Sequence, residues 1–132
     1  MADARILVVD DDRSIRSLAT TVLASAGYDV REAGSGEEAF EVLEREACAL
    51  VLLDINMPGM DGWQTLRLIR ADERLAGTPV VMCSIKSELH DKMTSLQEGA
   101  DDYLSKPFAV DELVRRVRAA LDGTGRAGPG EP

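Results

Sequence analysis

The chain has 132 residues and a formal net charge of -9, and 45% of its residues are hydrophobic while 30% are charged. This length fits one domain with its own hydrophobic core, and the excess of acidic residues argues against direct binding to nucleic acid. No apolar run approaches the roughly 20 residues of a membrane-spanning helix, so we expect a cytoplasmic protein without a membrane partner. The two cysteines, Cys48 and Cys83, stand apart in apolar surroundings, which is typical of buried thiols in a reducing compartment.

The chain opens with a predicted strand and a predicted helix. The strand covers Arg5 to Val9 and is followed by three carboxylates, Asp10, Asp11 and Asp12. Six apolar residues then recur at helical spacing, which indicates an amphipathic helix with one buried stripe: Ile15, Leu18, Ala19, Val22, Leu23 and Ala26. Gly27 is placed to end this helix, because glycine readily adopts the left-handed conformation that often follows a helix.

A second strand, a second helix and a third strand follow. The second strand is predicted over Tyr28 to Glu32. Ser35 and Glu38 have the spacing of a capping box, which opens a helix with three apolar residues inward: Ala39, Val42 and Leu43. The third strand, Leu50 to Leu53, is apolar throughout, and such a run is typical of a parallel strand covered by helices on both faces.

One carboxylate, Asp54, ends the third strand. The residues after it include Asn56, Pro58 and Gly59, which predict an irregular loop rather than a hairpin. A lone Asp before a loop is usually a turn or helix-capping residue, and this interpretation holds until other residues can be shown to join Asp54.

A third helix and a fourth strand are predicted next. The helix carries three apolar residues at helical spacing: Trp63, Leu66 and Ile69. The strand covers Val80 to Cys83 and ends at Ser84. A fourth helix, from about Glu88 to Glu98, is expected to bury one apolar face and to end at Gly99; that face consists of Leu89, Met93 and Leu96.

The last strand candidate, Asp102 to Ser105, precedes the pair Lys106 and Pro107. A final helix follows Ala109, which is a weak capping residue, and five apolar residues are in helical register along it: Val110, Leu113, Val114, Val117 and Leu121. Beyond it the sequence is rich in glycine and proline, so residues 122–132 are predicted to be a disordered tail or a truncated linker.

Five strands that alternate with five helices predict one α/β domain over residues 4–121. Parallel pairing through right-handed crossovers gives a three-layer, doubly wound domain around a five-stranded parallel sheet. The carboxyl ends of all five strands then share one edge of the sheet, and ligands bind at that edge in open α/β sheets.

This topology brings together the polar residues that follow the first, third, fourth and fifth strands: Asp10, Asp11, Asp54, Ser84 and Lys106. Two carboxylates about 4 Å apart repel by about 4 kcal/mol at an effective dielectric of about 20, so three need raised pKa values or a bound cation. Oxygen ligands without histidine or cysteine favour Mg²⁺. A lysine and a hydroxyl group opposite a carboxylate predict a phosphoryl-acceptor site.

Four segments, in order, resemble the receiver domain of two-component response regulators, the family of the single-domain chemotaxis regulator: ILVVDDD, LLDINMPGMDG, PVVMCS and GADDYLSKPF. The resemblance covers residues 4 to 121 and implies a flavodoxin-like fold with strand order 2-1-3-4-5. It implies a phosphorylation-activated signalling switch that receives its phosphoryl group from a histidine kinase or a phosphotransfer protein. The output surface would be the fourth helix, fifth strand and fifth helix, which would face a partner protein that the sequence does not name.

The resemblance also assigns the residues around the metal. Asp54 would be the phosphorylated aspartate, Asp11 would bind Mg²⁺ directly, and Asp10 would act mostly through water. Asn56 would offer its backbone carbonyl to the metal. Asp12 is spare in this register and is predicted to cap the first helix instead.

The remaining roles concern the phosphoryl group. By the resemblance, Ser84 would donate a hydrogen bond to it, Lys106 would pair with it, and Tyr103 would change rotamer with the state of the domain. Pro107 would follow a cis peptide bond. Such a domain would not be an enzyme for separate substrates, because its Mg²⁺-dependent autophosphorylation and autodephosphorylation are limited to its own aspartate. Ile85 departs from the pattern, since the family usually has a small residue after the switch serine.

Two other functions stay open at this stage. A haloacid-dehalogenase-like phosphatase also forms an aspartyl phosphate, but it needs a second Asp two residues after the first, where this chain has Asn56. A receiver-like binding module that acts without phosphorylation is the other alternative, and the bulk of Ile85 keeps it open. His90, the only histidine, is interpreted as a surface residue rather than a phosphorelay site.

Overall fold

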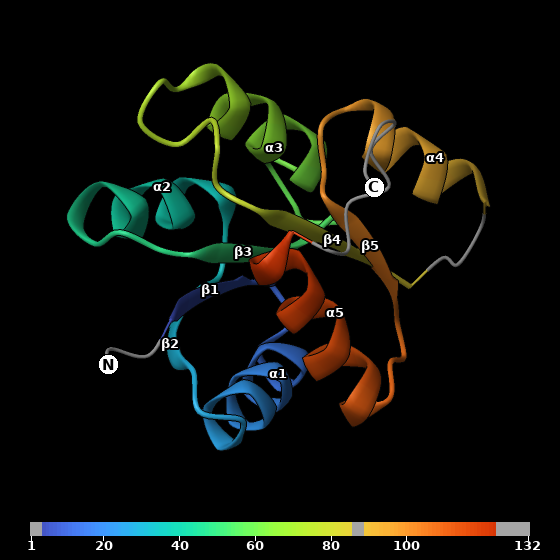
Figure 1. Ribbon diagram of the computed structural model, residues 1–132. Helices are drawn as coiled ribbons and strands as arrows, with labels where there is room; N and C mark the ends of the chain where they lie inside the picture. Colours follow the sequence, from blue (N-terminus) through green and yellow to red (C-terminus); the bar gives the residue numbers. More distant parts are fainter. Residues whose placement is uncertain (1–3, 86–88, 124–132) are drawn as a thin grey trace.

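The computed structural model describes residues 4–85 and 89–123 (Figure 1). The strands are β1 (Arg5–Val9), β2 (Asp29–Ala33), β3 (Leu50–Asp54), β4 (Val80–Ser84) and β5 (Asp102–Ser105). The helices are α1 (Arg13–Ser25), α2 (Gly36–Arg45), α3 (Gly62–Ala71), α4 (Leu89–Gln97) and α5 (Val110–Asp122). Strands and helices alternate as predicted, and β2 starts one residue later than expected.

The five strands form one parallel sheet in the order β2-β1-β3-β4-β5, which confirms the predicted fold. Helices α1 and α5 cover one face of the sheet, and α2, α3 and α4 lie on the other face (Figure 1). Because every strand runs in the same direction, the residues at the strand ends meet at one edge.

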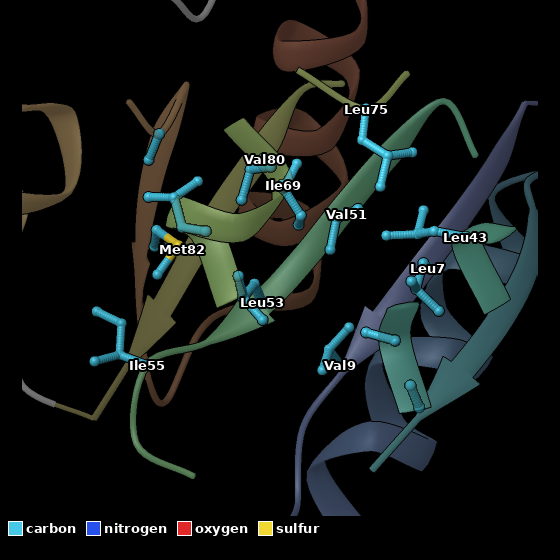
Figure 2. Close-up of a cluster of buried hydrophobic side chains, with 14 of the residues drawn as sticks. Leu7, Val9, Leu43, Val51, Leu53, Ile55, Ile69, Leu75, Val80 and Met82 are labelled. Atoms are coloured by element: carbon cyan, nitrogen blue, oxygen red, sulfur yellow. The ribbon is translucent and has the colours of Figure 1, made fainter. Parts of the chain in front are cut away.

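The core consists of two layers, one on each face of the sheet. Alternate residues of each strand point to opposite faces, so Leu7, Val51 and Met82 pack toward α2 and α3 (Figure 2). Ile6 and Leu52 pack toward α1 and α5. Burial on both faces explains why the strand sequences are apolar throughout rather than alternating.

Some apolar residues that the sequence pattern turns inward are exposed in the structure. They are Leu18 in α1, Met93 and Leu96 in α4, and Val110 at the start of α5, and Ala26 after α1 is also exposed. In α1 the buried residues Ala19 and Leu23 lie at the centre of the stripe. Among the α4 residues whose side chains the structure describes, the buried one is the small Ser95. Helical spacing therefore gave the direction of the stripes in α1 and α5 but overestimated their width. In α4 the prediction was wrong for Met93 and Leu96, which are both exposed.

The helix starts are held by side-chain caps. Asp12 caps α1 as predicted, because its carboxylate accepts hydrogen bonds from the backbone N–H groups of Ser14 and Ile15. Ser35 caps α2 by accepting from the Glu38 N–H group at 3.1 Å. The carboxylate of Glu38 accepts from the backbone N–H of Gly34 rather than from Ser35, so the predicted capping box is only half formed.

A complete capping box lies at α3, where the sequence analysis did not expect one. Asp61 accepts a hydrogen bond from the Gln64 N–H group at 2.9 Å, and the Gln64 side chain accepts from the Asp61 N–H group at 3.0 Å. This box fixes the point at which the loop after Asp54 turns into α3.

Several predicted features lie partly outside the residues that the structure describes. Glu88, the predicted first residue of the fourth helix, and the side chains of Leu89 and His90 lie outside the described residues, as does most of the predicted tail over 122–132. Of the cysteines, Cys83 is buried as predicted, whereas Cys48 is only half-buried. In the ranges that the structure describes, no helix has the length and apolar character needed to cross a membrane.

Candidate metal and phosphoryl-acceptor site

Five polar residues occupy the carboxyl edge of the sheet. Asp10 and Asp11 follow β1 directly, Asp54 is the last residue of β3, Ser84 is the last residue of β4, and Lys106 follows β5. Asp10, Asp54 and Lys106 are 4%, 5% and 8% exposed, and Ser84 is fully buried, whereas Asp11 is exposed. The fold thus brings together residues that are up to 96 positions apart in the chain.

Lys106 bridges two of the carboxylates. Its Nζ lies 2.6 Å from Oδ2 of Asp10 and 3.1 Å from Oδ1 of Asp54, and all three side chains are buried. Charged hydrogen bonds of this kind are among the stronger ones in proteins. One positive charge therefore faces two buried negative charges, which leaves the pocket with an excess of negative charge.

The three aspartates form a cluster of oxygen atoms. One carboxylate oxygen from each of Asp10, Asp11 and Asp54 lies within 4.8 Å of the other two. Carboxylate oxygens without nitrogen or sulfur ligands suit a hard cation such as Mg²⁺, and the exposed Asp11 opens the cluster to solvent. Asp12 is outside this cluster, since its carboxylate caps α1.

The pocket changes the acidity of its central carboxyl group. Burial raises the pKa of Asp54 to about 6; Lys106 lowers it, and the nearby charges of Asp10 and Asp11 raise it further. Burial also acts to lower the pKa of Lys106, but its hydrogen bond and ion pairs with Asp10 and Asp54 outweigh this and raise the pKa above its ordinary value. At neutral pH the lysine is charged and Asp54 is largely ionised.

The loop between β3 and α3 is held tightly behind Asp54. The Ile55 N–H group donates to the carbonyl of Cys83 at 2.9 Å, and the Gly62 N–H group donates to the carbonyl of Ile55 at 2.8 Å. A Cβ atom at Gly62 would collide with the backbone of Asp54 and Ile55, so only glycine fits there. Asn56 lies in this loop with an exposed side chain, two residues after Asp54.

The residues predicted to respond to phosphorylation lie on neighbouring strands. The Lys106 N–H group donates to the carbonyl of Ser84 at 2.7 Å, and Tyr103 pairs with Met82 in the β4–β5 register. The Tyr103 side chain is only 4% exposed and packs into the core on the α2–α3 face. The Lys106–Pro107 peptide bond is cis, as the resemblance implies, and the Ile85 side chain is exposed.

Arg16 is a residue of this edge that the sequence analysis did not identify. Its guanidinium group donates to the backbone carbonyl of Asp10 at 2.8 Å and to Glu32 at 2.9 Å, so it ties β1, α1 and β2 together. The only sequence signal is an arginine in the first turn of a helix after an acidic run. That signal is weak, because its partner Glu32 comes from another strand.

Comparisons with known proteins agree with this geometry. Residues 6–118 match the family model of the response regulator receiver domain. The DNA-binding response regulator MtrA of Mycolicibacterium paratuberculosis is 45% identical over 117 residues, which are 89% of this chain and 51% of that protein. The transcriptional regulatory protein GltR of Pseudomonas aeruginosa is 42% identical over 116 residues, which are 88% of this chain and 48% of that protein.

Solved structures give the same result for the fold. A putative response regulator from Chloroflexus aurantiacus has a TM-score of 0.87 and 34% identity, with 91% of this chain and 98% of that chain covered. The chemotaxis protein CheY4 of Vibrio cholerae has a TM-score of 0.86 and 30% identity, with 90% and 99% covered. The chain spans about half the length of the curated relatives named above. From the family match and the edge of acidic residues together, the chain belongs to the family of response regulator receiver domains.

Proposed function

We propose that Asp54 accepts a phosphoryl group and that this modification switches the domain between two signalling states. The observation that carries the proposal is the buried Asp54 carboxylate, which lies 3.1 Å from the Lys106 ammonium group and beside Asp10 and Asp11. A carboxylate at the edge of a parallel sheet, with a cation beside it, is well placed to act as a nucleophile toward phosphorus.

The proposed donor is the phosphohistidine of a histidine kinase or a phosphotransfer protein. An Asp54 carboxylate oxygen attacks the phosphorus atom, the bond from phosphorus to the histidine nitrogen breaks, and the electron pair leaves with the imidazole. Lys106 is positioned to balance the charge of the phosphoryl oxygens, and Ser84 supplies a hydroxyl group on the next strand. The pKa of about 6 leaves Asp54 ionised and nucleophilic at neutral pH.

The proposed cofactor is Mg²⁺, held by Asp10, Asp11, Asp54 and the backbone carbonyl of Asn56. The all-oxygen donor set supports this choice, and the metal would neutralise negative charge on the transferred phosphoryl group. Asp12 takes no part, because its carboxylate already accepts two backbone hydrogen bonds.

The proposed output surface is formed by α4, β5 and α5. Lys106 directly follows β5 and Ser84 precedes α4, so a new charge at Asp54 would act on both elements. Exposed apolar side chains of Ile85, Met93 and Val110 lie along this region and suit contact with a partner protein. The identity of that partner is set by the pathway, and the acidic composition of the chain gives no support for nucleic acid binding by this domain itself.

The phosphatase alternative receives no support from the site. Its mechanism requires an acid/base aspartate two residues after the nucleophile, and Asn56 cannot supply that proton transfer. The phosphorylation-independent binding module is also not favoured, because the family match and the intact acidic edge both point to phosphoryl acceptance.

Labelling with a small phosphodonor tests the proposal without a kinase. Incubation with acetyl phosphate and Mg²⁺ should give one labile phosphoryl adduct by intact-protein mass spectrometry. The adduct should be absent from Asp54→Asn and from samples with excess chelator. His90→Ala serves as the control variant and should be labelled like the wild type. Equal labelling of Asp54→Asn would refute the acceptor assignment.

A further inference from the structure

A groove of about 620 Å³ is lined by residues of α2, of α3 and of the segments next to α3. Helices α2 and α3 lie on the face of the sheet opposite α1 and α5 (Figure 1). Four apolar residues and four acidic residues line it: Phe40, Met60, Leu68, Ala71, Glu37, Glu41, Glu44 and Asp72. None of the eight takes part in the pocket around Asp54 and Lys106. The groove is therefore a separate feature of the molecule.

The apolar side chains that line the groove are not fully covered by the rest of the domain. Leu66 and Ile69 of α3 are fully buried against the sheet, but Leu68 between them is 46% exposed in the groove. Phe40 and Met60 are half-buried and line the same groove, and Phe40 also packs against the core. Exposed apolar side chains that gather in a hollow, rather than singly, mark an interaction site.

Three of the four acidic residues that line the groove form a rim along one side of it. Glu37, Glu41 and Glu44 are exposed and recur at helical spacing, so they lie along one side of α2. Asp72 on the opposite wall pairs with Arg74 at 3.2 Å, and Arg74 also lies near Glu44. Within the described ranges, Glu37 and Glu41 have no such ion-pair partner, so their charges are available to a ligand.

We propose that this groove binds a basic amphipathic helix of a partner protein. Two neighbouring helices with an apolar furrow between them fit the apolar face of a third helix, and the acidic rim requires lysine or arginine at its margins. The chain's own net charge of -9 opposes a second copy at this site, and an anionic lipid surface would be repelled for the same reason. The inference concerns the unmodified domain and does not depend on phosphorylation of Asp54.

The dimensions of α2 limit the ligand. Its 10 residues extend about 15 Å, so a bound helix needs about 12 residues, or roughly three turns. Apolar side chains at positions i, i+3 or i+4, and i+7 would enter the groove beside Leu68 and Phe40. Lysine or arginine side chains on the flanks would reach Glu37 and Glu41.

A displayed library of random peptides of about 12 residues tests the proposal. Selection against the wild-type domain should enrich peptides with apolar residues at helical spacing and a net positive charge. The strongest peptide, labelled with a fluorophore, is then titrated with purified variants and followed by anisotropy. Glu41→Lys and Leu68→Ser should each weaken binding by about tenfold. Asp111→Lys, the same charge change on exposed α5, should alter it by less than about twofold.

Circular dichroism shows whether each variant is folded. If Leu68→Ser does not fold, Glu37→Lys replaces it as a second groove variant, and it should also weaken peptide binding. The proposal is overturned if selection yields no basic amphipathic peptide, if Glu41→Lys and Asp111→Lys weaken binding equally, or if neither groove variant weakens it. Sedimentation tests the remaining occupant: a dimer that Leu68→Ser dissociates would show that the groove takes a second copy, and it would equally overturn the proposal.

Discussion

The ionisation of Asp54 connects the site to the stability of the domain. Burial, together with the charges of Asp10 and Asp11, raises its pKa from 3.8 to about 6 despite the opposing effect of Lys106. The folded state therefore holds a proton that the unfolded state has released between about pH 4 and pH 6. The stability contribution of the protonated carboxyl group is present below that window and is lost as the pH rises through it.

Replacing this carboxylate should stabilise the metal-free domain at neutral pH. We expect Asp54→Asn to raise the free energy of unfolding by about 1 to 2 kcal/mol at pH 7, because the amide removes the cost of a buried charge beside Asp10. Urea denaturation in the presence of a chelator measures the difference. The gain should shrink as the pH falls toward 4, and a gain that is the same at pH 4 and pH 7 would contradict the assigned cause. Asp111→Asn, an exposed site, is the matched control.

Substitution of the adjacent residues Asp11 and Asp12 should have different effects, because Asp11 is proposed to bind the metal and Asp12 caps α1. Asp11→Ala removes one of three clustered carboxylates and should weaken Mg²⁺ binding by at least about tenfold in a calorimetric titration. Asp12→Ala should leave the affinity within about twofold and instead cost about 1 kcal/mol of stability, since it removes the cap of α1. Equal losses of Mg²⁺ affinity would mean that the two roles are wrongly assigned.

At the scale of the elements, α4 and β5 carry the proposed response to phosphorylation. Ser84 lies at the end of β4, and Tyr103 in β5 lies next to Met82 in β4. The sequence-based hypothesis has Tyr103 turn inward when Ser84 moves toward the phosphoryl group. In the structure the Tyr103 side chain is only 4% exposed. Because the ring is already buried, we expect phosphorylation to alter how often its inward position is occupied rather than to bury an exposed ring.

Chemical shifts can follow this coupling along the chain. Beryllofluoride with Mg²⁺, a mimic of the phosphoryl group, should shift amide resonances around the pocket and from Ser84 through Arg116. Resonances of α1 beyond its first turn should shift less. Ser84→Ala should leave the pocket shifts in place and reduce the remote ones, because it removes the hydroxyl group that we propose couples the modification to α4 and β5. Remote shifts of unchanged size in Ser84→Ala would rule out this route.

The sequence was sufficient to predict the sheet and its acidic edge, since buried parallel strands read as apolar runs and their ends are marked by Asp10, Asp54, Ser84 and Lys106. It was not sufficient for contacts that join distant segments. The bond from Arg16 to Glu32 and the burial of Tyr103 depend on packing between elements, which local spacing does not encode.

The buried faces of the helices could also be predicted only in part from the sequence. The spacing of apolar residues in α1 and α4 identifies a stripe, but only the arrangement of neighbours decides whether Leu18 or Met93 is covered. The complete capping box at Asp61 and Gln64 was readable in principle, because an acidic residue with Gln three positions later is its pattern. It was missed because the residues after Asp54 were interpreted only as an irregular loop.

The whole molecule presents distinct regions around one sheet. The edge with Asp54 and Lys106 is the proposed acceptor site, the region of α4, β5 and α5 is the proposed output surface, and the groove between α2 and α3 is the proposed binding site for a basic helix. Phosphorylation would add about 1.5 to 2 negative charges to a chain that already carries a net charge of -9. Lys106, whose Nζ lies 3.1 Å from Asp54, would offset part of this added charge at the proposed site.

The central claim is that the phosphoryl group resides on Asp54, and reductive trapping locates it directly. Borohydride reduces an acyl phosphate to an alcohol and releases phosphate, so it marks the modified aspartate permanently. After labelling with acetyl phosphate and Mg²⁺, peptide mass spectrometry should find the reduced residue at Asp54 alone. A reduced residue at Asp10 or Asp11, or an adduct on His90 that borohydride leaves unreduced, would contradict the account.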